Sequence, residues 1–311
     1  MIRIEKYSKD LELDWNNFVA ASRNATFLFN RSYMDYHADR FEDHSLMFYE
    51  EQKLVSCLPA NLADDILYSH QGLTYGGLLV GRKMRATLIL ELFSELLQYL
   101  RQQNIKKFIY KPIPHFYSSI PSEEDLYALF RNQAQLFRRD ISSVINLKDR
   151  IQFSELRRRM IKKAKSQKLQ VRESQDFQSF YQILQNNLQS KYETSAVHSA
   201  AEIEELSLNF PDNIKLYGCF KDSEMLAATW VFINKNTIHL QYISNSDKGR
   251  KTGALDLIID YLVNEKYRNW NYFDFGISTQ EEGFLLNEGL VSQKEMFGGR
   301  AYCYDHYLLQ L

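Results

Sequence analysis

The sequence predicts an α/β protein of two similar domains, each with a mixed sheet flanked by helices. Three observations lead to this prediction. The chain has 311 residues, of which 45% are hydrophobic, enough for one large or two medium cores. In the second half, three closely spaced strand patterns precede a helix and a further strand. A similar order of strand, helix and strand occurs in the first half.

Composition argues against several classes of protein. Lys and Arg (38) nearly balance Asp and Glu (39), for a net charge of −1, so nucleic-acid binding needs a local basic patch and DNA is not an expected partner. Cys57, Cys219 and Cys303 form no CxxC pair, which argues against a disulfide framework or a thiolate metal site. No metal is expected. The first residues do not resemble a signal peptide and no apolar run is long enough to span a membrane, so we expect a cytoplasmic protein.

The first half is expected to contain short strands and one long amphipathic helix. Apolar alternation or continuous apolar runs place strands at 2–7, 45–50, 54–62, 66–70 and 107–111. Apolar residues at three- and four-residue spacing place helices at 15–22, 83–103 and 126–132. Ser122 and Asp125 form a capping-box-like start for the last of these helices.

We place the domain boundary before a basic helix, which gives an N-terminal domain at 1–150 and a C-terminal domain at 151–311. The other expected helices of the second half are 177–191, 199–209 and 254–265. Strands are expected at 169–173, 214–220, 225–233, 237–244, 272–275 and 302–311. The middle three strands predict an antiparallel meander, because the breaks between them are too short for crossovers.

The basic helix at 151–167 has two interpretations. Charged helix surfaces are usually solvated, and this is the simpler one. Alternatively, its cations form a binding surface for an anionic partner such as tRNA or a nucleotide-sugar.

Two segments repeat the same layout. The first runs from the strand at 66–69 through Gly81-Arg-Lys83 and a helix to the strand at 108–110. The second runs from the strand at 238–244 through Gly249-Arg-Lys251 and a helix to 272–275. Similar order at an offset of about half the chain indicates duplication of one unit.

Short motifs in this order resemble the FemABX-type GNAT proteins, over nearly the whole chain. In the second half they are Gly249-Arg-Lys-Thr-Gly-Ala254, Phe273-Asp-Phe-Gly-Ile-Ser278, Asn287-Glu-Gly-Leu290 and Gln293-Lys-Glu-Met-Phe-Gly298. In the first half, Thr74-Tyr-Gly-Gly-Leu78 resembles an N-terminal signature of the family. The resemblance implies tandem GNAT folds, in which the C-terminal domain holds the acyl donor and the degenerate N-terminal domain serves the acceptor side.

The activity that the resemblance implies is N-acyl transfer from acetyl-CoA or another acyl-CoA to an amine. The best-matching subset implies an amino sugar or a cell-surface polysaccharide precursor as acceptor, including a nucleotide-linked sugar. Two alternatives remain. One is a tRNA-dependent aminoacyl transferase acting on a peptidoglycan precursor, and the other is a non-catalytic binding protein that keeps the fold. We expect one donor to bind per chain, in the C-terminal half.

The resemblance also places the donor's phosphates on the loop after the strand at 237–244. Backbone N–H groups at a helix N-terminus bind anions, which is the physical reason for such a site. The usual phosphate motif is matched here only at Gly253. The candidate donor-binding residues are Ser244, Gly249, Arg250, Lys251, Thr252, Gly253 and Ala254.

Four residues are candidates for the chemistry. Lys294 either stabilises an oxyanion or phosphate, as the resemblance implies, or is a surface lysine. Asp274 lies between two phenylalanines. It orients the donor, assists proton removal, or is a hydrogen-bonded core residue. His239 is either a base or a core histidine, and Tyr242 is a candidate acid for a departing thiolate.

Further residues are candidates for substrate binding. Gln241 shares a strand face with His239. Lys191, Tyr192 and His198 precede a helix whose N-terminus can receive an anion, although simple capping by Ser199 explains that segment equally well. Tyr75, Gly76 and Gly77 form either an acceptor-side wall or a tight turn.

Overall fold

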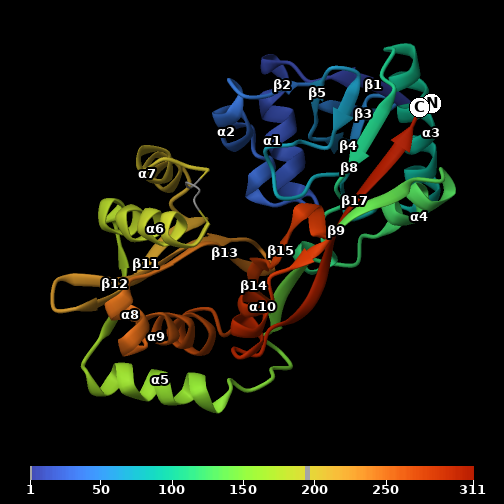
Figure 1. Cartoon of the computed structure of the whole chain (residues 1–311). Coiled ribbons are helices and arrows are strands. Elements are labelled where there is room, and N and C mark those ends of the chain that lie inside the picture. Colours follow the sequence, from blue (N-terminus) through green and yellow to red (C-terminus); the bar gives the residue numbers. More distant parts are fainter. Residues whose placement is uncertain (1, 193–196) are drawn as a thin grey trace. The chain divides into compact units, whose positions relative to one another are not determined.

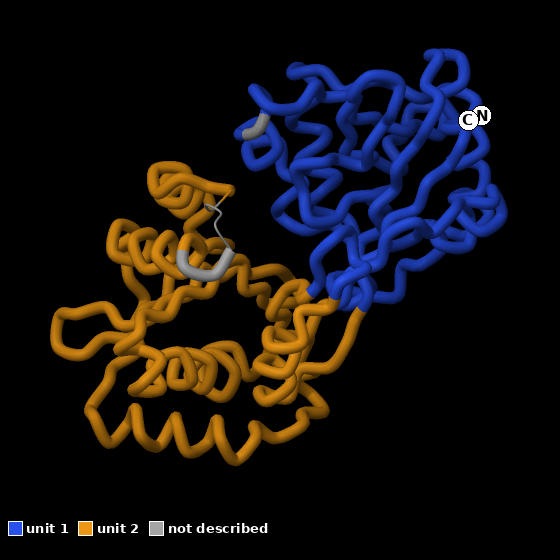
Figure 2. Tube along the Cα trace, in the orientation of Figure 1, with its two compact units in different colours: residues 1–141, 279–285, 303–311 blue, residues 142–278, 286–302 orange. Residues whose placement is uncertain are grey.

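A computed structural model describes residues 2–192 and 197–311 (Figure 1). The chain divides into two compact units, which Figure 2 shows in different colours. Unit 1 comprises residues 1–141, 279–285 and 303–311, and unit 2 comprises residues 142–278 and 286–302. The division differs from the expected domains, 1–150 and 151–311, because the end of the chain returns to unit 1.

Two long strands explain this difference. β9 (Gln135–Asn146) and β17 (Arg300–Gln310) each contribute residues to both units. β9 was not among the expected strands. It contains no glycine or proline at the point where the units divide, so the sequence carries no local marker of the boundary.

Unit 2 contains a mixed sheet with the expected antiparallel meander. Its strands are hydrogen-bonded in the order β10-β11-β12-β13-β14-β9. β13 pairs in parallel with β14, whereas each of the other neighbouring pairs in this order is antiparallel. Besides β9, the strands are β10 (Gln170–Ser174), β11 (Ile214–Lys221), β12 (Glu224–Ile233), β13 (Thr237–Asn245) and β14 (Tyr272–Ile277).

Helices cover both faces of this sheet. In Figure 1, α6 and α7 lie on one face, and α8, α9 and α5 lie on the other. Apolar residues of α9 are buried against β11 and β12, which forms the core of the unit. Ser199 caps α7, as simple capping predicts, and it forms a capping box with Glu202. The helices are α5 (Glu155–Ser166), α6 (Phe177–Tyr192), α7 (Ala200–Asn209), α8 (Asp247–Thr252), α9 (Ala254–Tyr261) and α10 (Glu288–Glu295).

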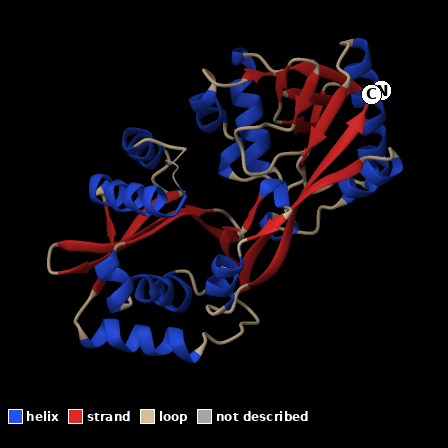
Figure 3. Cartoon of the chain, viewed as in Figure 1, coloured by secondary structure: helices blue, strands red, loops and turns tan. Residues whose placement is uncertain are grey.

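Unit 1 contains two sheets. One has the order β1-β3-β4-β7, and the other continues from β17 through β8, β6 and β5 to β2. Its strands are shown in red in Figure 3. They are β1 (Ile2–Lys6), β2 (Glu42–Asp43), β3 (Leu46–Glu50), β4 (Lys53–Leu58), β5 (Asn61–Ala63), β6 (Ile66–Tyr68), β7 (Leu79–Val80) and β8 (Lys107–Tyr110).

The helices of unit 1 differ from the sequence-based expectation at one N-cap. They are α1 (Glu12–Ala21), α2 (Arg31–Met34), α3 (Ala86–Gln102) and α4 (Glu124–Arg131). Ser122 does not cap α4, whose N-cap residue is Glu123. The Ser122 hydroxyl accepts a hydrogen bond from Arg23 at 3.1 Å, and Asp125 accepts one from the Tyr110 hydroxyl at 2.7 Å. These long-range partners outcompete the local cap.

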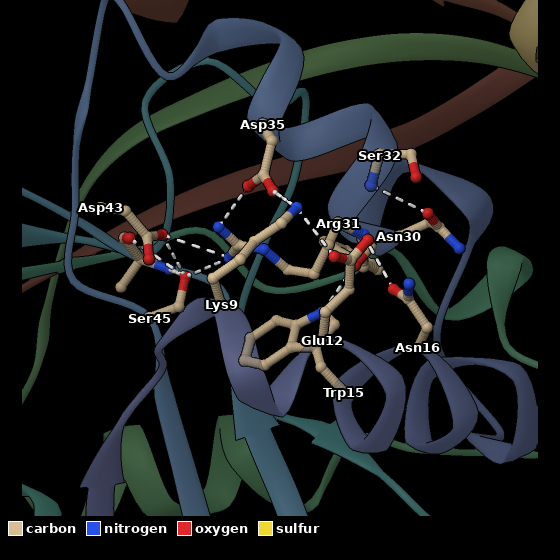
Figure 4. Close-up of polar contacts among 12 residues, drawn as sticks. Lys9, Glu12, Trp15, Asn16, Asn30, Arg31, Ser32, Asp35, Asp43 and Ser45 are labelled. Carbon is tan, nitrogen blue, oxygen red and sulfur yellow. Dashed lines mark hydrogen bonds and ion pairs between the residues drawn. The ribbon is translucent and has the colours of Figure 1, made fainter.

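A buried arginine anchors α2 in unit 1 (Figure 4). Arg31 is 3% exposed and forms ion pairs with Asp35 and Asp43. Its guanidinium lies 3.8 Å from the centre of the Tyr7 ring, which adds a cation–π contact. Two carboxylates therefore offset the cost of burying this charge.

The predicted repeat corresponds to two parallel crossovers. β6 pairs in parallel with β8 in unit 1, with α3 between them in the chain. β13 pairs in parallel with β14 in unit 2, with α8 and α9 between them. The sequence-level repeat therefore marks the same β–α–β connection in each unit.

Candidate functional site

The two parallel strands of unit 2 separate after a short paired stretch. β13 and β14 pair at Thr237 with Tyr272, Ile238 with Phe273, and His239 with Asp274. β13 then continues to Asn245 with a bulge that leaves Gln241 without a partner in β12. β14 turns at Gly276, which has φ +76. Strand pairing thus ends at His239 and Asp274, and we call the opening beyond them the β13–β14 gap.

Asp274 lies at the closed end of this gap and is fully buried. Its Oδ1 accepts hydrogen bonds from the Ser142 hydroxyl at 2.6 Å and the Gly276 N–H at 2.8 Å. Its Oδ2 lies 2.8 Å from His239 Nδ1. With Oδ1 held by two donors, Oδ2 of Asp274 is placed to accept a hydrogen bond from the protonated Nδ1 of His239.

His239 is the more exposed member of this pair. The residue is 9% exposed, whereas Asp274 is 0% exposed. When Nδ1 carries the proton and donates it to Asp274, Nε2 is left with a lone pair. The arrangement can therefore accept a proton at Nε2 while the carboxylate stabilises the resulting cation.

Lys294 lies on α10 and is 5% exposed, so it is not a surface lysine. Its Nζ donates hydrogen bonds to the carbonyls of Gly276 at 2.7 Å and Ile277 at 2.8 Å and to the Ser278 hydroxyl at 2.8 Å. Burial lowers the pKa of Lys294 to about 8, although the nearby Asp274 charge opposes this shift. Its three donors fix the turn after Asp274, and binding a substrate oxygen requires one of them to be released.

The helix that carries Lys294 was not predicted, although a signal was present. The Asn287 side chain caps α10 by accepting a hydrogen bond from Leu290 N at 3.0 Å. An asparagine just before the family-like segment marks such a start.

A cavity of about 420 Å³ lies in unit 2 and is called the β13 cavity. It is lined from β13 by Ile243 and Asn245, and by residues of α5, α6, α8, α9 and α10. Two of its lining residues, Arg157 and Asp256, form an ion pair at 3.1 Å. Within the described chain, Arg157 Nε and Asn245 Oδ1 are buried without a hydrogen-bond partner. Its size and these two polar atoms fit a small-molecule group better than a packing defect.

The expected phosphate loop is folded, and most of its polar groups are hydrogen-bonded to one another or to neighbouring residues. The Ser246 hydroxyl accepts from Gly249 N at 3.0 Å, and Arg250 Nη1 donates to the Asn245 carbonyl at 2.6 Å and pairs with Asp247 through Nη2. Thr252 donates to Lys248 O. Of the seven candidate residues of this segment, Arg250 lines the β13 cavity.

Several glycine and small-residue positions in this segment have packing roles. Gly253 has φ +79 and separates α8 from α9, and an added Cβ lies 2.4 Å from the Met160 carbonyl of α5. Gly249 is packed against Leu226, while Ser244 and Ala254 are buried. Lys251 is exposed. Their roles in donor binding stay predictions.

Tyr242 is paired with His198 rather than with the Asp274 network. Its hydroxyl lies 2.9 Å from His198 Nδ1, and its ring stacks on Trp230. Burial raises the pKa of Tyr242 to about 12. Its role as an acid stays a prediction. The side chains of Lys191 and Tyr192 lie outside the described residues.

In unit 1 the equivalent gap between β6 and β8 is filled. Gly76 donates its N–H to the Lys111 carbonyl at 2.8 Å, and an added Cβ at Gly76 lies 1.9 Å from the Ser69 carbonyl. The loop thus passes between the ends of the two strands. Gly77 packs under the Tyr110 hydroxyl, and Tyr75 is 2% exposed. These residues have a packing role, and the acceptor wall stays a prediction.

Two properties of the described residues bear on cofactors and location. No group of three or more His, Cys, Asp or Glu side chains in the described ranges is placed to hold a metal ion. Among residues 2–192 and 197–311, no helix has the length and apolarity needed to cross a bilayer.

No protein-family model matches the sequence, and no curated protein matches it significantly. Solved structures do match. A structure of FemX aligns with TM-score 0.70 at 8% identity, covering 99% of this chain and 97% of that chain. L-PGS from Bacillus licheniformis aligns with TM-score 0.63 at 13% identity, covering 98% and 92%. A tandem GNAT protein from the clavulanic acid biosynthesis pathway aligns with TM-score 0.53 at 9% identity, covering 100% and 98%.

These matches run over the full length of the chain and define its class of fold. The chain has a tandem GNAT fold, and within that class it has the FemX-like form. The fold predicted from the sequence is confirmed.

Proposed function

We propose that this chain is an acyltransferase that transfers an acyl group to an amine at the β13–β14 gap of unit 2. The observation that carries the proposal is the Ser142–Asp274–His239 network at the point where the two strands separate. The FemX-like tandem GNAT fold supports the same class of reaction. A base of this kind is what an attacking amine needs, because the amine must lose a proton as the new bond forms.

The proposed roles follow from the contacts. His239 Nε2 accepts the proton that the amine loses as its nitrogen bonds to the acyl carbon. Asp274 keeps His239 oriented and stabilises its charged form, and Ser142 positions Asp274. The bond between the acyl carbon and the leaving group then breaks, and the proton passes from His239 to that group. Lys294 holds the turn at Gly276 that keeps Asp274 in place.

The contacts made by α8 indicate which donor fits this site. The first donor candidate, an acyl-CoA, needs phosphate contacts at this helix. Here the Ser246 side chain already caps Gly249, and Arg250 is held by Asp247 and Asn245. An ester of tRNA needs no pyrophosphate site at this loop, so we infer that an aminoacyl-tRNA donor fits these contacts better than acyl-CoA.

Acyl-CoA remains the second candidate donor because of the β13 cavity. The cations Arg157 and Arg250 and the side chain of Asn245 line this cavity, beside the loop on which the resemblance places the donor's phosphates. An amino sugar, a polysaccharide precursor or a peptidoglycan precursor is the proposed amine acceptor in either case.

A paired donor assay tests the proposal. Acetyl-CoA and longer acyl-CoAs, and separately a pool of aminoacyl-tRNAs, are incubated with the full chain and amino-sugar or peptidoglycan-precursor amines. We expect amide formation that is lost in His239→Ala and kept in Lys221→Ala, an exposed lysine at the end of β11. Donor binding without transfer to any amine supports the non-catalytic alternative, and equal transfer by wild type and His239→Ala excludes the proposed base.

A further inference from the structure

We propose that a basic groove along α5 binds the phosphate backbone of an RNA whose end enters the β13 cavity. This inference rests on the aminoacyl-tRNA form of the proposed function. It assigns the RNA-contacting surface, which the Asp274 network does not define.

The α5 groove is an open depression of about 700 Å³ in unit 2. Four cations line it: Arg150, Arg158, Lys162 and Lys165. Phe153 and Ile161 supply apolar surface. Cations around a concave apolar floor suit a ligand with phosphates outside and flat bases or sugars inside.

Much of the charge in this groove is not neutralised by the protein. Lys165 pairs with Asp260 at 2.8 Å, and Arg150 donates to Asn264. Arg158 and Lys162 are exposed, and in the described part of the chain neither forms an ion pair. The chain as a whole has a net charge of −1, so this groove is the local basic patch that binding of a polyanion requires.

The groove cations share one face of the helix. Arg158, Lys162 and Lys165 are spaced by four and three residues, which places them in a row. With a rise of 1.5 Å per residue, the row extends over about 10 Å. A row of this length contacts consecutive phosphates of one strand rather than a lone anion.

The same helix also forms a wall of the β13 cavity. Arg157 and Met160 of α5 line that cavity, while Arg158 and Ile161 line the groove. The two depressions are thus separated by one helix, about 10 Å across. In Figure 1, α5 runs alongside α9 on the face of the unit 2 sheet opposite α6. An RNA held in the groove therefore reaches the cavity around this one helix.

An anionic membrane is the competing occupant, and the shape argues against it. A membrane surface is flat, and it contacts a projecting face of a protein. Here Lys162 and Arg158 line a depression that also contains the Asp260 carboxylate and the Asn264 amide.

Salt-dependent binding of deacylated tRNA to the full-length chain tests the inference. Fluorescence anisotropy is measured over a series of salt concentrations for wild type, for Arg158→Glu with Lys162→Glu, and for a charge-matched control, Lys221→Glu with Lys235→Glu. Loss of two phosphate contacts lowers the slope of log affinity against log salt by about 1.5 and weakens binding roughly tenfold. The control is expected to retain the wild-type slope, and thermal melting checks that all variants are folded.

Several outcomes overturn the inference. The inference is overturned if the wild-type chain does not bind tRNA. It is also overturned if both double variants lose tRNA affinity equally, because that result indicates a general charge effect. Vesicles containing phosphatidylglycerol are run in parallel, and a groove variant that loses vesicle binding but keeps tRNA binding assigns the groove to a membrane instead. Acyl transfer from acyl-CoA without tRNA binding refutes the groove but retains the proposed function. Groove-dependent tRNA binding without acyl transfer retains the groove but contradicts the proposed function.

Discussion

The two β–α–β crossovers of this chain differ at the ends of their paired strands. In unit 1, Gly76 passes between the ends of β6 and β8 and bonds to Lys111. In unit 2, β13 and β14 separate after His239 and Asp274, and polar side chains gather at the opening. One topology therefore gives either packed backbone or a candidate reaction site, depending on whether a loop is available to fill the gap.

The buried cations of the two units show a related contrast. Arg31 in unit 1 is offset by Asp35 and Asp43 (Figure 4). Lys294 in unit 2 donates instead to neutral oxygens, and burial lowers its pKa to about 8. Lys294 is therefore able to lose its proton, whereas a guanidinium keeps its charge in proteins.

The largest expected effect comes from the polar network at the unit 2 gap. Asp274→Asn keeps the volume but presents an amide to His239 and removes the negative charge. We expect kcat for acyl transfer to fall by about 10²- to 10³-fold, because His239 loses the partner that stabilises its charged form. Steady-state kinetics with the donor that supports transfer in the paired assay measures this loss.

Ser142→Ala is expected to have a smaller effect than Asp274→Asn. It removes one donor from Asp274 but leaves His239 and the carboxylate in place. We expect roughly a tenfold fall in kcat. Equal kcat for wild type and Asp274→Asn contradicts the proposed base.

A matched glycine pair tests the difference between the two gaps. At Gly76 an added Cβ lies 1.9 Å from the Ser69 carbonyl, so Gly76→Ala is expected to cost about 3 kcal/mol of unfolding free energy. At Gly276 the contact to His239 is 3.4 Å, and the left-handed backbone dominates, so Gly276→Ala is expected to cost about 1 kcal/mol. Urea unfolding gives both values, and a larger cost at Gly276 reverses the comparison.

The proton on Lys294 predicts a pH dependence of stability. Its pKa is lowered from 10.5 to about 8 in the folded chain, so between these values the unfolded chain binds more protons. Stability therefore rises as the pH increases through this range, by roughly 3 kcal/mol from this group. Lys294→Met is expected to remove that part of the rise. Lys111, whose pKa burial lowers to about 7, gives a further rise in both proteins. Unfolding curves in urea across the range measure the slope, and an unchanged slope in Lys294→Met contradicts the assignment.

The smallest effect is expected at Tyr242. Tyr242→Phe removes the hydrogen bond to His198, at a cost of about 1 kcal/mol in stability. Activity is expected to change by less than about threefold, because this hydroxyl contacts His198 rather than the Asp274 network. Thermal melting and kcat measure the two effects. A hundredfold loss of kcat without a change in melting temperature assigns the protonation of the leaving group to Tyr242 in place of His239.

Much of the secondary structure was predictable because its signals are local. The meander, both parallel crossovers and the Ser199 capping box follow from apolar periodicity and from residues a few positions apart. β9 was missed because a strand crossing from one unit to the other has no local boundary. The Ser122 cap was wrong because Arg23, which is distant in the sequence, binds that hydroxyl.

The identity of most candidate residues was predictable from the sequence, but the contacts between them were not. Asp274, His239 and Lys294 could be selected as polar residues in apolar or family-like segments. Ser142 carries no signal in the sequence, and its contact with Asp274 depends on β9 pairing beside β14. The basic helix was visible as a run of cations, but its groove depends on the loop before α5 and on the end of α9.

The sequence by itself determined the class of fold, the repeated crossover and the residue types that can carry proton transfer, because periodicity and local motifs are properties of neighbouring residues. Only the tertiary structure decided that the unit 1 gap is filled, that Lys294 is buried against neutral oxygens, and that Ser142, His239 and Asp274 form one network. These contacts join residues far apart in the chain, and their energies depend on burial, which no local pattern fixes.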